Sequence, residues 1–196
     1  MKFSSHEVRD LFFAWILLSI AFAILFVGER GLFTSQFPVF FGISFLTAGI
    51  GFVLHELAHK IVAQKYRLWA EFKASYGMLL IAIGLSFVGF IFAAPGAVYI
   101  HGMITKERNG KISVAGPIVN IVLAVLFLIP LLILGDMNEI IQLFFILGFR
   151  INALLAIFNM IPVMPFDGAK VIAWNKGVYW IVTIIALILF LGSWVI

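Results

Sequence analysis

Long apolar runs, separated by short polar connections, extend over almost the whole chain. A helix needs about 20 predominantly apolar residues to cross the hydrocarbon core of a bilayer. Several runs approach or exceed this length, so the pattern predicts an all-α polytopic membrane protein with five to six transmembrane segments. The apolar segments lie at residues 11–27, 37–54 with an amphipathic continuation to about 65, 77–94, 113–134, 139–161 and 178–196.

Short clusters of polar residues, glycine and proline mark the ends of these segments. The stretches "GERG", "TKERNG" and "GDMN" are typical of polar turns, while "AAPG" and "IPVMPFDG" place proline and glycine where helices should stop. Gly116 and Pro117 of "GPIVN" are expected to begin a helix. The first run, "LFFAWILLSIAFAILFV", exceeds the apolar core of a usual signal peptide, so we predict a retained helix there.

The segment 77–94 differs from the others because it is rich in glycine and is followed by Pro95 and the β-leaning "AVYIHG". We expect residues 70–112 to form a membrane-associated β-hairpin or re-entrant region. Such irregular backbone is tolerated at membrane depth only where it is buried in protein or lines a wet cavity.

The distribution of lysine and arginine supports this interpretation. If 77–94 crosses the membrane, six of these residues lie on each side. If it turns back, eleven lie on the side of the N-terminus and Arg30 alone lies on the other. Cytoplasmic loops carry an excess of positive charge. The charge pattern therefore favours five full crossings of a cell membrane, with the N-terminus in the cytoplasm.

Composition restricts the alternatives. With 196 residues, 64% hydrophobic and 11% charged, the chain has too little polar surface for a water-soluble globule. We expect one integral-membrane domain over residues 1–196, in contact with membrane lipid. Cysteine is absent, so disulfides and thiolate ligands are excluded. The net charge of +4 comes from short loops beside apolar segments and does not indicate nucleic-acid binding.

One apolar run ends in "HELAH", residues 55–59, which matches H-E-x-x-H. His55 and His59 lie four residues apart on one helical face, so both imidazoles can reach one zinc ion. Zinc lowers the pKa of bound water to about 7, and the adjacent Glu56 can accept the proton as water attacks a carbonyl. This is metalloprotease chemistry.

Two simpler explanations remain for these residues. Chance produces the motif in well under about one in a hundred chains of this length. Alternatively, the side chains form a polar network that holds helices together. Ionisable groups are expensive in hydrocarbon and mark functional sites there, which favours the metal.

A catalytic zinc usually has a third protein ligand. His6 lies in the N-terminal tail, and His101 lies in the expected hairpin. Asp136 and Glu139 lie in a turn on the wrong side in the five-crossing topology. Asp167 is the acid that fits.

Together, "HELAH", "GPIVN" and "NMIPVMPFDG" resemble the site-2 protease family of intramembrane zinc metalloproteases, in a minimal archaeal-type form without PDZ or CBS domains. The motifs occur in the family's order over residues 55–168. Phe166 stands where the family more often has leucine. The resemblance implies regulated intramembrane proteolysis of a transmembrane-protein substrate.

By this resemblance, His55, His59 and Asp167 bind one Zn²⁺, and Glu56 is the catalytic glutamate. Asn159 helps to hold the substrate carbonyl or oxyanion. The topology agrees, because a helix from Phe37 carries the histidines about 27 to 33 Å along its axis. Asp167 then follows a helix that returns to the same side.

Other polar residues are interpreted structurally. Asn120 is expected to hydrogen-bond to a neighbouring helix. His101 is expected to be a hydrogen-bonded or solvated hairpin residue. Arg150 lies within a predicted helix and must pair or reach water. Two rival functions are a metal- or proton-coupled transporter, which often has repeated halves, and a catalytically silent relative that binds membrane proteins.

Overall fold

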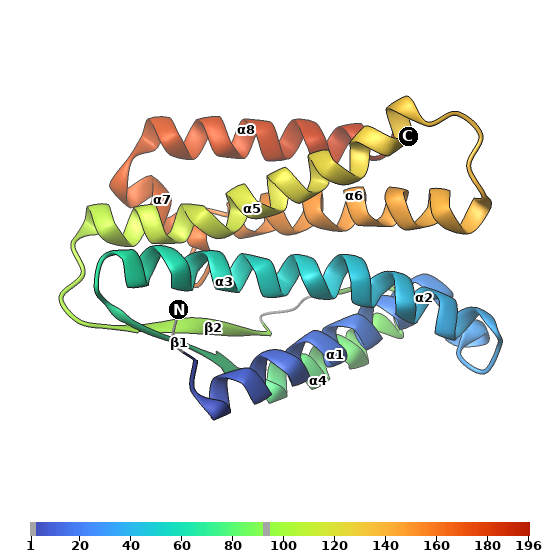
Figure 1. Ribbon diagram of the computed structural model, residues 1–196, viewed down its shortest axis with the longest axis horizontal. Coiled ribbons are helices and arrows are strands. Elements are labelled where there is room, and N and C mark those ends of the chain that lie inside the picture. The colour runs from blue at the N-terminus through green and yellow to red at the C-terminus, as the bar shows by residue number, and fades with distance from the viewer. Residues whose placement is uncertain (1–2, 92–94) are drawn as a thin grey trace. The chain divides into compact units, whose positions relative to one another are not determined.

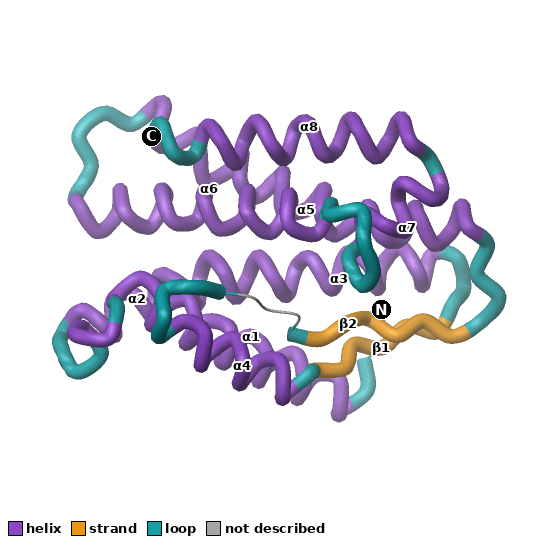
Figure 2. The backbone as a smooth tube through the Cα atoms, turned by 180° about the vertical axis from the view of Figure 1, so that it is seen from behind, coloured by secondary structure: helices purple, strands orange, loops and turns teal. Residues whose placement is uncertain are grey.

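The computed structural model describes residues 3–91 and 95–196. The chain divides into two compact units. The first contains Met1–Val53 and Glu71–Tyr99, and the second contains Leu54–Ala70 and Ile100–Ile196. The path of the chain through its helices and strands is shown in Figures 1 and 2.

The first unit begins with α1 (Ser5–Val27). Ser4 caps this helix, because its hydroxyl oxygen accepts a hydrogen bond from Glu7 N at 3.1 Å. The helix ends at Gly28, whose φ of 68° favours glycine. A short 3₁₀ turn, η1 (Glu29–Gly31), follows and confirms the turn predicted from "GERG".

A helical stretch over 36–65 comes next, made of α2 (Gln36–Ser44), a π turn η2 (Phe45–Gly49) and α3 (Ile50–Lys65). The wider π turn presents the carbonyl of Phe45 to Trp15 Nε1, which donates to it at 2.8 Å. The Trp15 indole stacks on the Phe45 ring at a centroid distance of 4.3 Å. Trp15 also fills the space that a Cβ at Gly49 would occupy.

The region expected to be irregular contains β1 (Trp69–Ala74), α4 (Tyr76–Ser86) and β2 (Gly96–His101). The two strands pair with each other, which confirms the expected β structure (Figure 2). The helix α4 runs beside α1 and has 11 residues. It is about 16 Å long, well short of the roughly 30 Å hydrocarbon core. Residues 92–94 of the predicted segment 77–94 lie outside the described residues.

Side chains of α1 accept hydrogen bonds from β1. Glu7 Oε1 accepts from Phe72 N at 3.0 Å, and Asp10 Oδ2 accepts from Ala74 N at 3.1 Å. Phe72 and Ala74 are two residues apart, so their amides lie on the same edge of the strand. These carboxylates therefore satisfy backbone donors that an edge strand otherwise leaves exposed.

The second unit contains α5 (Lys106–Ile133), α6 (Glu139–Asn159), α7 (Asp167–Trp174) and α8 (Lys176–Gly192). The three longer helices lie side by side, and short α7 packs against α5 and α8 (Figure 1). Small residues allow close packing of α5 and α6: Ala124 and Ala153 are fully buried with Phe149 between these helices.

The sequence-based start of α5 is wrong. Gly116 and Pro117 do not begin a helix, and "TKERNG" is not a turn. The helix begins at Lys106 because Thr105 is its N-cap and accepts a hydrogen bond from Arg108 N at 3.2 Å. Pro117 lies within the helix, and membrane helices tolerate an internal proline when neighbouring groups satisfy the freed backbone carbonyl.

Among the residues that the structure describes, four helical stretches are long and apolar enough to cross a membrane. They are Ser5–Val27, Gln36–Lys65, Lys106–Ile133 and Glu139–Asn159. Two further apolar helices, Tyr76–Ser86 and Lys176–Gly192, are shorter. The mainly helical, membrane-type fold is thus confirmed for the described residues, whereas the predicted five to six crossings are not.

Two contacts of Arg150 hold the C-terminal end of α8. Arg150 Nε donates to the carbonyl oxygen of Ser193 at 2.9 Å, and the guanidinium lies 5.5 Å from the centre of the Trp194 ring. The predicted need of Arg150 for a partner is therefore met by the C-terminal end of α8.

Candidate metal centre

The two histidines of the H-E-x-x-H motif lie on the part of α3 that belongs to the second unit. Both side chains are buried, and their rings meet edge to face with centroids 4.6 Å apart. The Nε2 atoms are 3.0 Å apart. The four-residue spacing therefore brings both ring nitrogens to one point, as helical periodicity predicts.

Asp167, 108 residues after His59, reaches the same point from the start of α7. Its Oδ2 atom lies 3.3 Å from His55 Nε2 and 3.0 Å from His59 Nε2. Among the described residues, these three side chains form a group that can hold a metal ion, with ligand atoms within 4.8 Å of one another. Two imidazoles and one carboxylate are a ligand set suited to zinc.

Hydrogen bonds on the far side of each ring determine which nitrogen faces the metal position. His55 Nδ1 donates to Asn120 Oδ1 at 2.6 Å, and His59 Nδ1 donates to the Ile112 carbonyl at 2.8 Å. A neutral imidazole that carries its proton on Nδ1 presents a lone pair at Nε2. Two lone pairs and a carboxylate oxygen therefore converge, and a cation satisfies this arrangement of acceptors.

The charge of Asp167 suits a cation site. Burial raises the pKa of this carboxyl group, but positive charge and hydrogen-bond donors at the His59 and His55 imidazoles outweigh burial and lower the pKa well below the usual value. A cation held by two neutral imidazoles supplies positive charge at the same place. Lys170 Nζ lies 3.4 Å from Oδ1, the oxygen that does not face the histidines, and Oδ2 is directed at the imidazoles.

The position between the ring nitrogens is open because residue 116 has no side chain. A Cβ at Gly116 would lie 2.5 Å from His55 Nε2 and 2.6 Å from His59 Nε2, which is closer than real Cβ contacts. Gly116 thus forms a wall of the candidate metal centre. It was predicted to begin a helix, and this contact was missed.

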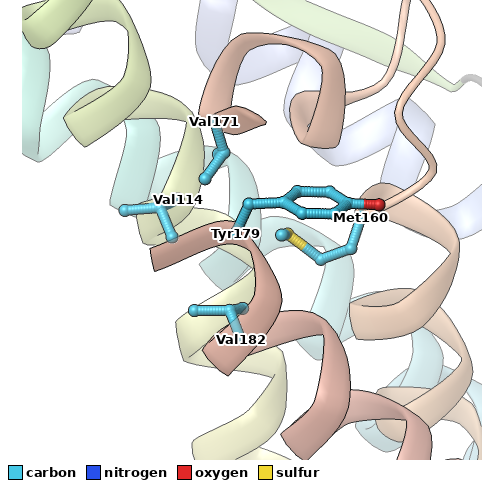
Figure 3. Packing of buried hydrophobic residues seen from close by; sticks show 5 residues of the cluster. All are labelled: Val114, Met160, Val171, Tyr179 and Val182. Atoms are coloured by element: carbon cyan, nitrogen blue, oxygen red, sulfur yellow. The ribbon is translucent and has the colours of Figure 1, made fainter. Parts of the chain in front are cut away.

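Two prolines and a buried cluster direct the chain from α6 back to the site. Pro162 and Pro165 lie in the loop between Asn159 and Asp167, where the sequence predicted that no regular helix forms. Val171 of α7 then packs with Val114, Met160, Tyr179 and Val182 (Figure 3). Because Val171 lies one helical turn after Asp167, this packing fixes the end of α7 that carries the carboxylate.

The structure places the remaining predicted residues as follows. Glu56 is buried on α3 next to His55. Asn159 is the last residue of α6, and its Nδ2 donates to the carbonyl of Leu155 at 2.9 Å. The His101 ring lies tilted against the Trp69 ring, with centroids 4.8 Å apart, in agreement with a structural role in the strand pair.

Asn120 has a second contact that the sequence analysis missed. Besides the predicted bond to a neighbouring helix, in which its Nδ2 donates to Asn152 Oδ1 at 3.1 Å, it accepts from His55. The spacing of three residues in the sequence could have indicated this contact. Ile112, Gly116 and Asn120 recur every four residues, so they share one face of α5.

Three curated proteins resemble the chain. The protein named "Putative zinc metalloprotease MJ0611" of Methanocaldococcus jannaschii is 41% identical over 198 residues, covering 98% of both chains. "Zinc metalloprotease MJ0392" of the same organism is 29% identical over 80% of this chain and 41% of its own length. "Putative zinc metalloprotease YwhC" of Bacillus subtilis is 28% identical over 65% of this chain and 66% of its own length. No family model and no solved structure matches.

Proposed function

The chain belongs to the zinc metalloprotease family, and we propose that it is an intramembrane protease of the site-2 type, which hydrolyses peptide bonds in or next to transmembrane segments of other membrane proteins. The observation that carries this proposal is the buried group of His55, His59 and Asp167, whose two histidines lie on a helical stretch long and apolar enough to cross a membrane. The predicted zinc cofactor is confirmed by the relatives and the ligand set together.

In this proposal, His55, His59 and Asp167 hold the zinc ion. Bound there, zinc supplies a Lewis acid that acidifies water and polarises a carbonyl group. Glu56 accepts the proton of the attacking water and delivers it to the departing amine, which is general acid–base catalysis by a carboxylate. Its position beside His55 on α3 supports this role.

Asn159 is proposed to donate a hydrogen bond from its Nδ2 to the substrate carbonyl or oxyanion. This donor now bonds to Leu155 O of the same helix. Because α6 ends at Asn159, a rotation of the side chain frees the amide without breaking the helix. Substrate binding is expected to supply the bond that replaces the one to Leu155.

A peptide bond inside a helix is hydrogen-bonded and crowded, so the substrate must unwind locally. We propose that an extended segment then adds to the strand pair, as peptides do at other sheet edges. The carboxylates of Glu7 and Asp10 already occupy amides of β1, so we assign the addition to β2. Water is expected to reach the zinc from the cytoplasmic side of a cell membrane, where the charge pattern places the N-terminus.

The first test compares purified wild type with Glu56→Gln in detergent, using a panel of single-span membrane proteins as substrates. Both proteins are expected to hold about one zinc per chain, and only wild type is expected to cut, because glutamine cannot accept the proton. Zinc content is measured by elemental analysis, and cleavage by mass spectrometry of the products.

The rival functions give different results. A silent relative binds zinc in both forms and cuts nothing, while a transporter moves zinc or protons across vesicles that contain wild-type protein. Absence of zinc in wild type supports the polar-network explanation. A Glu56→Gln protein that cuts as fast as wild type contradicts the assigned role of Glu56.

A further inference from the structure

A chain of three hydrogen bonds runs from the backbone of α6 through α5 to the imidazole of His55. Asn152 Nδ2 donates to the carbonyl of Gly148 at 2.9 Å. Asn120 Nδ2 donates to Asn152 Oδ1 at 3.1 Å, and His55 Nδ1 bonds to Asn120 Oδ1 at 2.6 Å. Both asparagine side chains are fully buried, with 0% exposure.

The direction of this chain is determined at its α6 end. A backbone carbonyl can only accept, so the amide of Asn152 must present nitrogen to Gly148 O. Its oxygen then faces Asn120, which must in turn present nitrogen to Asn152. This leaves Asn120 Oδ1 toward His55, and an amide oxygen can only accept. The proton of His55 is therefore placed on Nδ1.

We propose that Asn152 and Asn120 are positioning residues that hold His55 in its Nδ1-protonated form and so direct the Nε2 lone pair at the metal. The proposal rests on the zinc centre assigned above. Groups of this kind typically change metal affinity by about 10- to 100-fold when they are removed. Asn152 contributes to this effect without touching a metal ligand itself.

His59 and His55 differ in the group that accepts the hydrogen bond from Nδ1, which is a backbone carbonyl for His59 and a side-chain amide for His55. His59 donates to Ile112 O, a backbone carbonyl whose direction is fixed by α5. Asn120 can rotate its amide by half a turn, which would present a donor to His55 Nδ1 and favour the other tautomer. The bond to Asn152 opposes that rotation, because the reversed amide of Asn120 would place oxygen against Asn152 Oδ1.

The experiment measures the zinc affinity of full-length protein in detergent by competition with a chelating dye. Asn120→Leu is expected to bind zinc at least about 10-fold more weakly than wild type. Asn120→Asp keeps an acceptor for His55 Nδ1 but places its second oxygen against Asn152 Oδ1, so a partial recovery of that loss is expected. Asn152→Leu leaves the amide of Asn120 without its orienting partner, so an intermediate loss is expected.

Two spectroscopic measurements separate positioning from general packing. Ring nitrogen NMR of zinc-free protein labelled with ¹⁵N-histidine reports the His55 tautomer directly, and the tautomer is expected to change in Asn120→Leu but not in Asn120→Asp. The visible absorption of Co²⁺-loaded protein is expected to change in the same variants. Thr183→Val removes a buried hydroxyl of α8 that takes no part in these three hydrogen bonds, and is the control expected to behave as wild type.

Equal losses in Asn120→Leu, Asn120→Asp and Asn152→Leu, with an unchanged tautomer, would overturn the proposal, because packing alone would then explain them. Wild-type zinc affinity in Asn120→Leu would overturn it as well. These readouts are independent of proteolysis. If the variants lose zinc affinity as expected but wild type cuts no substrate, the positioning role stands and the proposed protease function fails.

Discussion

At the scale of single residues, the candidate metal centre depends on the absence of a side chain at Gly116. Each imidazole beside it is held at Nδ1 by a hydrogen bond, one to Asn120 Oδ1 and one to Ile112 O. The rings therefore cannot turn away without losing a buried hydrogen bond, which typically costs about 1 to 3 kcal/mol. Gly116 is thus constrained by its neighbours rather than by its backbone conformation.

Gly116→Ala is expected to weaken zinc binding by at least about 10-fold, because the new methyl group occupies the space beside both Nε2 atoms. The measurement is zinc affinity by chelator competition. Gly42→Ala is the matched control, since Gly42 also lies in a helix but has open space around its Cβ position. Unchanged affinity in Gly116→Ala would show that the metal lies elsewhere.

At the scale of elements, short α7 determines where the third acidic group lies. The helix has 8 residues, too few to be stable by itself in water. Its position comes from tertiary packing, in which Val171 is fully buried against Val114 of α5 and Tyr179 of α8 (Figure 3). Gly168 permits this packing, because a Cβ there would collide with the backbone of Met160.

Val171→Ala is expected to destabilise the protein by about 2 kcal/mol, since it removes two buried methyl groups and leaves a cavity. It is also expected to weaken zinc binding, because Asp167 lies one turn away on the same helix. Thermal unfolding in detergent and chelator competition measure the two effects. Val195→Ala, at an exposed position, is the control. If Val171→Ala is destabilised but keeps normal zinc affinity, the packing of Val171 does not hold Asp167 at the metal site.

At the scale of the whole molecule, the candidate zinc centre brings together segments that are distant in sequence. Two of its candidate ligands come from α3 and one from α7, within the same compact unit. A metal that binds the folded chain but not the unfolded chain stabilises the fold by mass action. The zinc centre is therefore expected to contribute to stability as well as to catalysis.

Removal of zinc by a strong chelator is expected to lower the thermal midpoint of wild type. At free zinc about 100 times the dissociation constant, the expected loss is about 2.7 kcal/mol. In His59→Ala, chelator should cause little further change, because one ligand is already missing. Identical midpoints for wild type with and without chelator would contradict a zinc centre built into this fold.

Several features were predictable because they depend on local sequence. The spacing of His55 and His59 places them on one face of any helix, and two prolines close together between Asn159 and Asp167 disfavour a regular helix there. The start of α5 was also local, since Thr105 is an ordinary N-cap, but the charged residues after it were mistaken for a turn. The five to six crossings stay a prediction, because four helical stretches of the described residues are long and apolar enough to cross a membrane and α8 is shorter.

The sequence by itself determined the helical membrane-type fold, the pair of histidines, the adjacent Glu56 and Asp167 as the acid that fits. These inferences rest on helical periodicity, the length of apolar runs and the ligand chemistry of zinc. Only the tertiary structure decided that Asp167 Oδ2 meets both Nε2 atoms, that Gly116 leaves room between them and that Asn120 orients His55. Asn120 and His55 are 65 residues apart, and helix packing, which periodicity does not specify, brings them together.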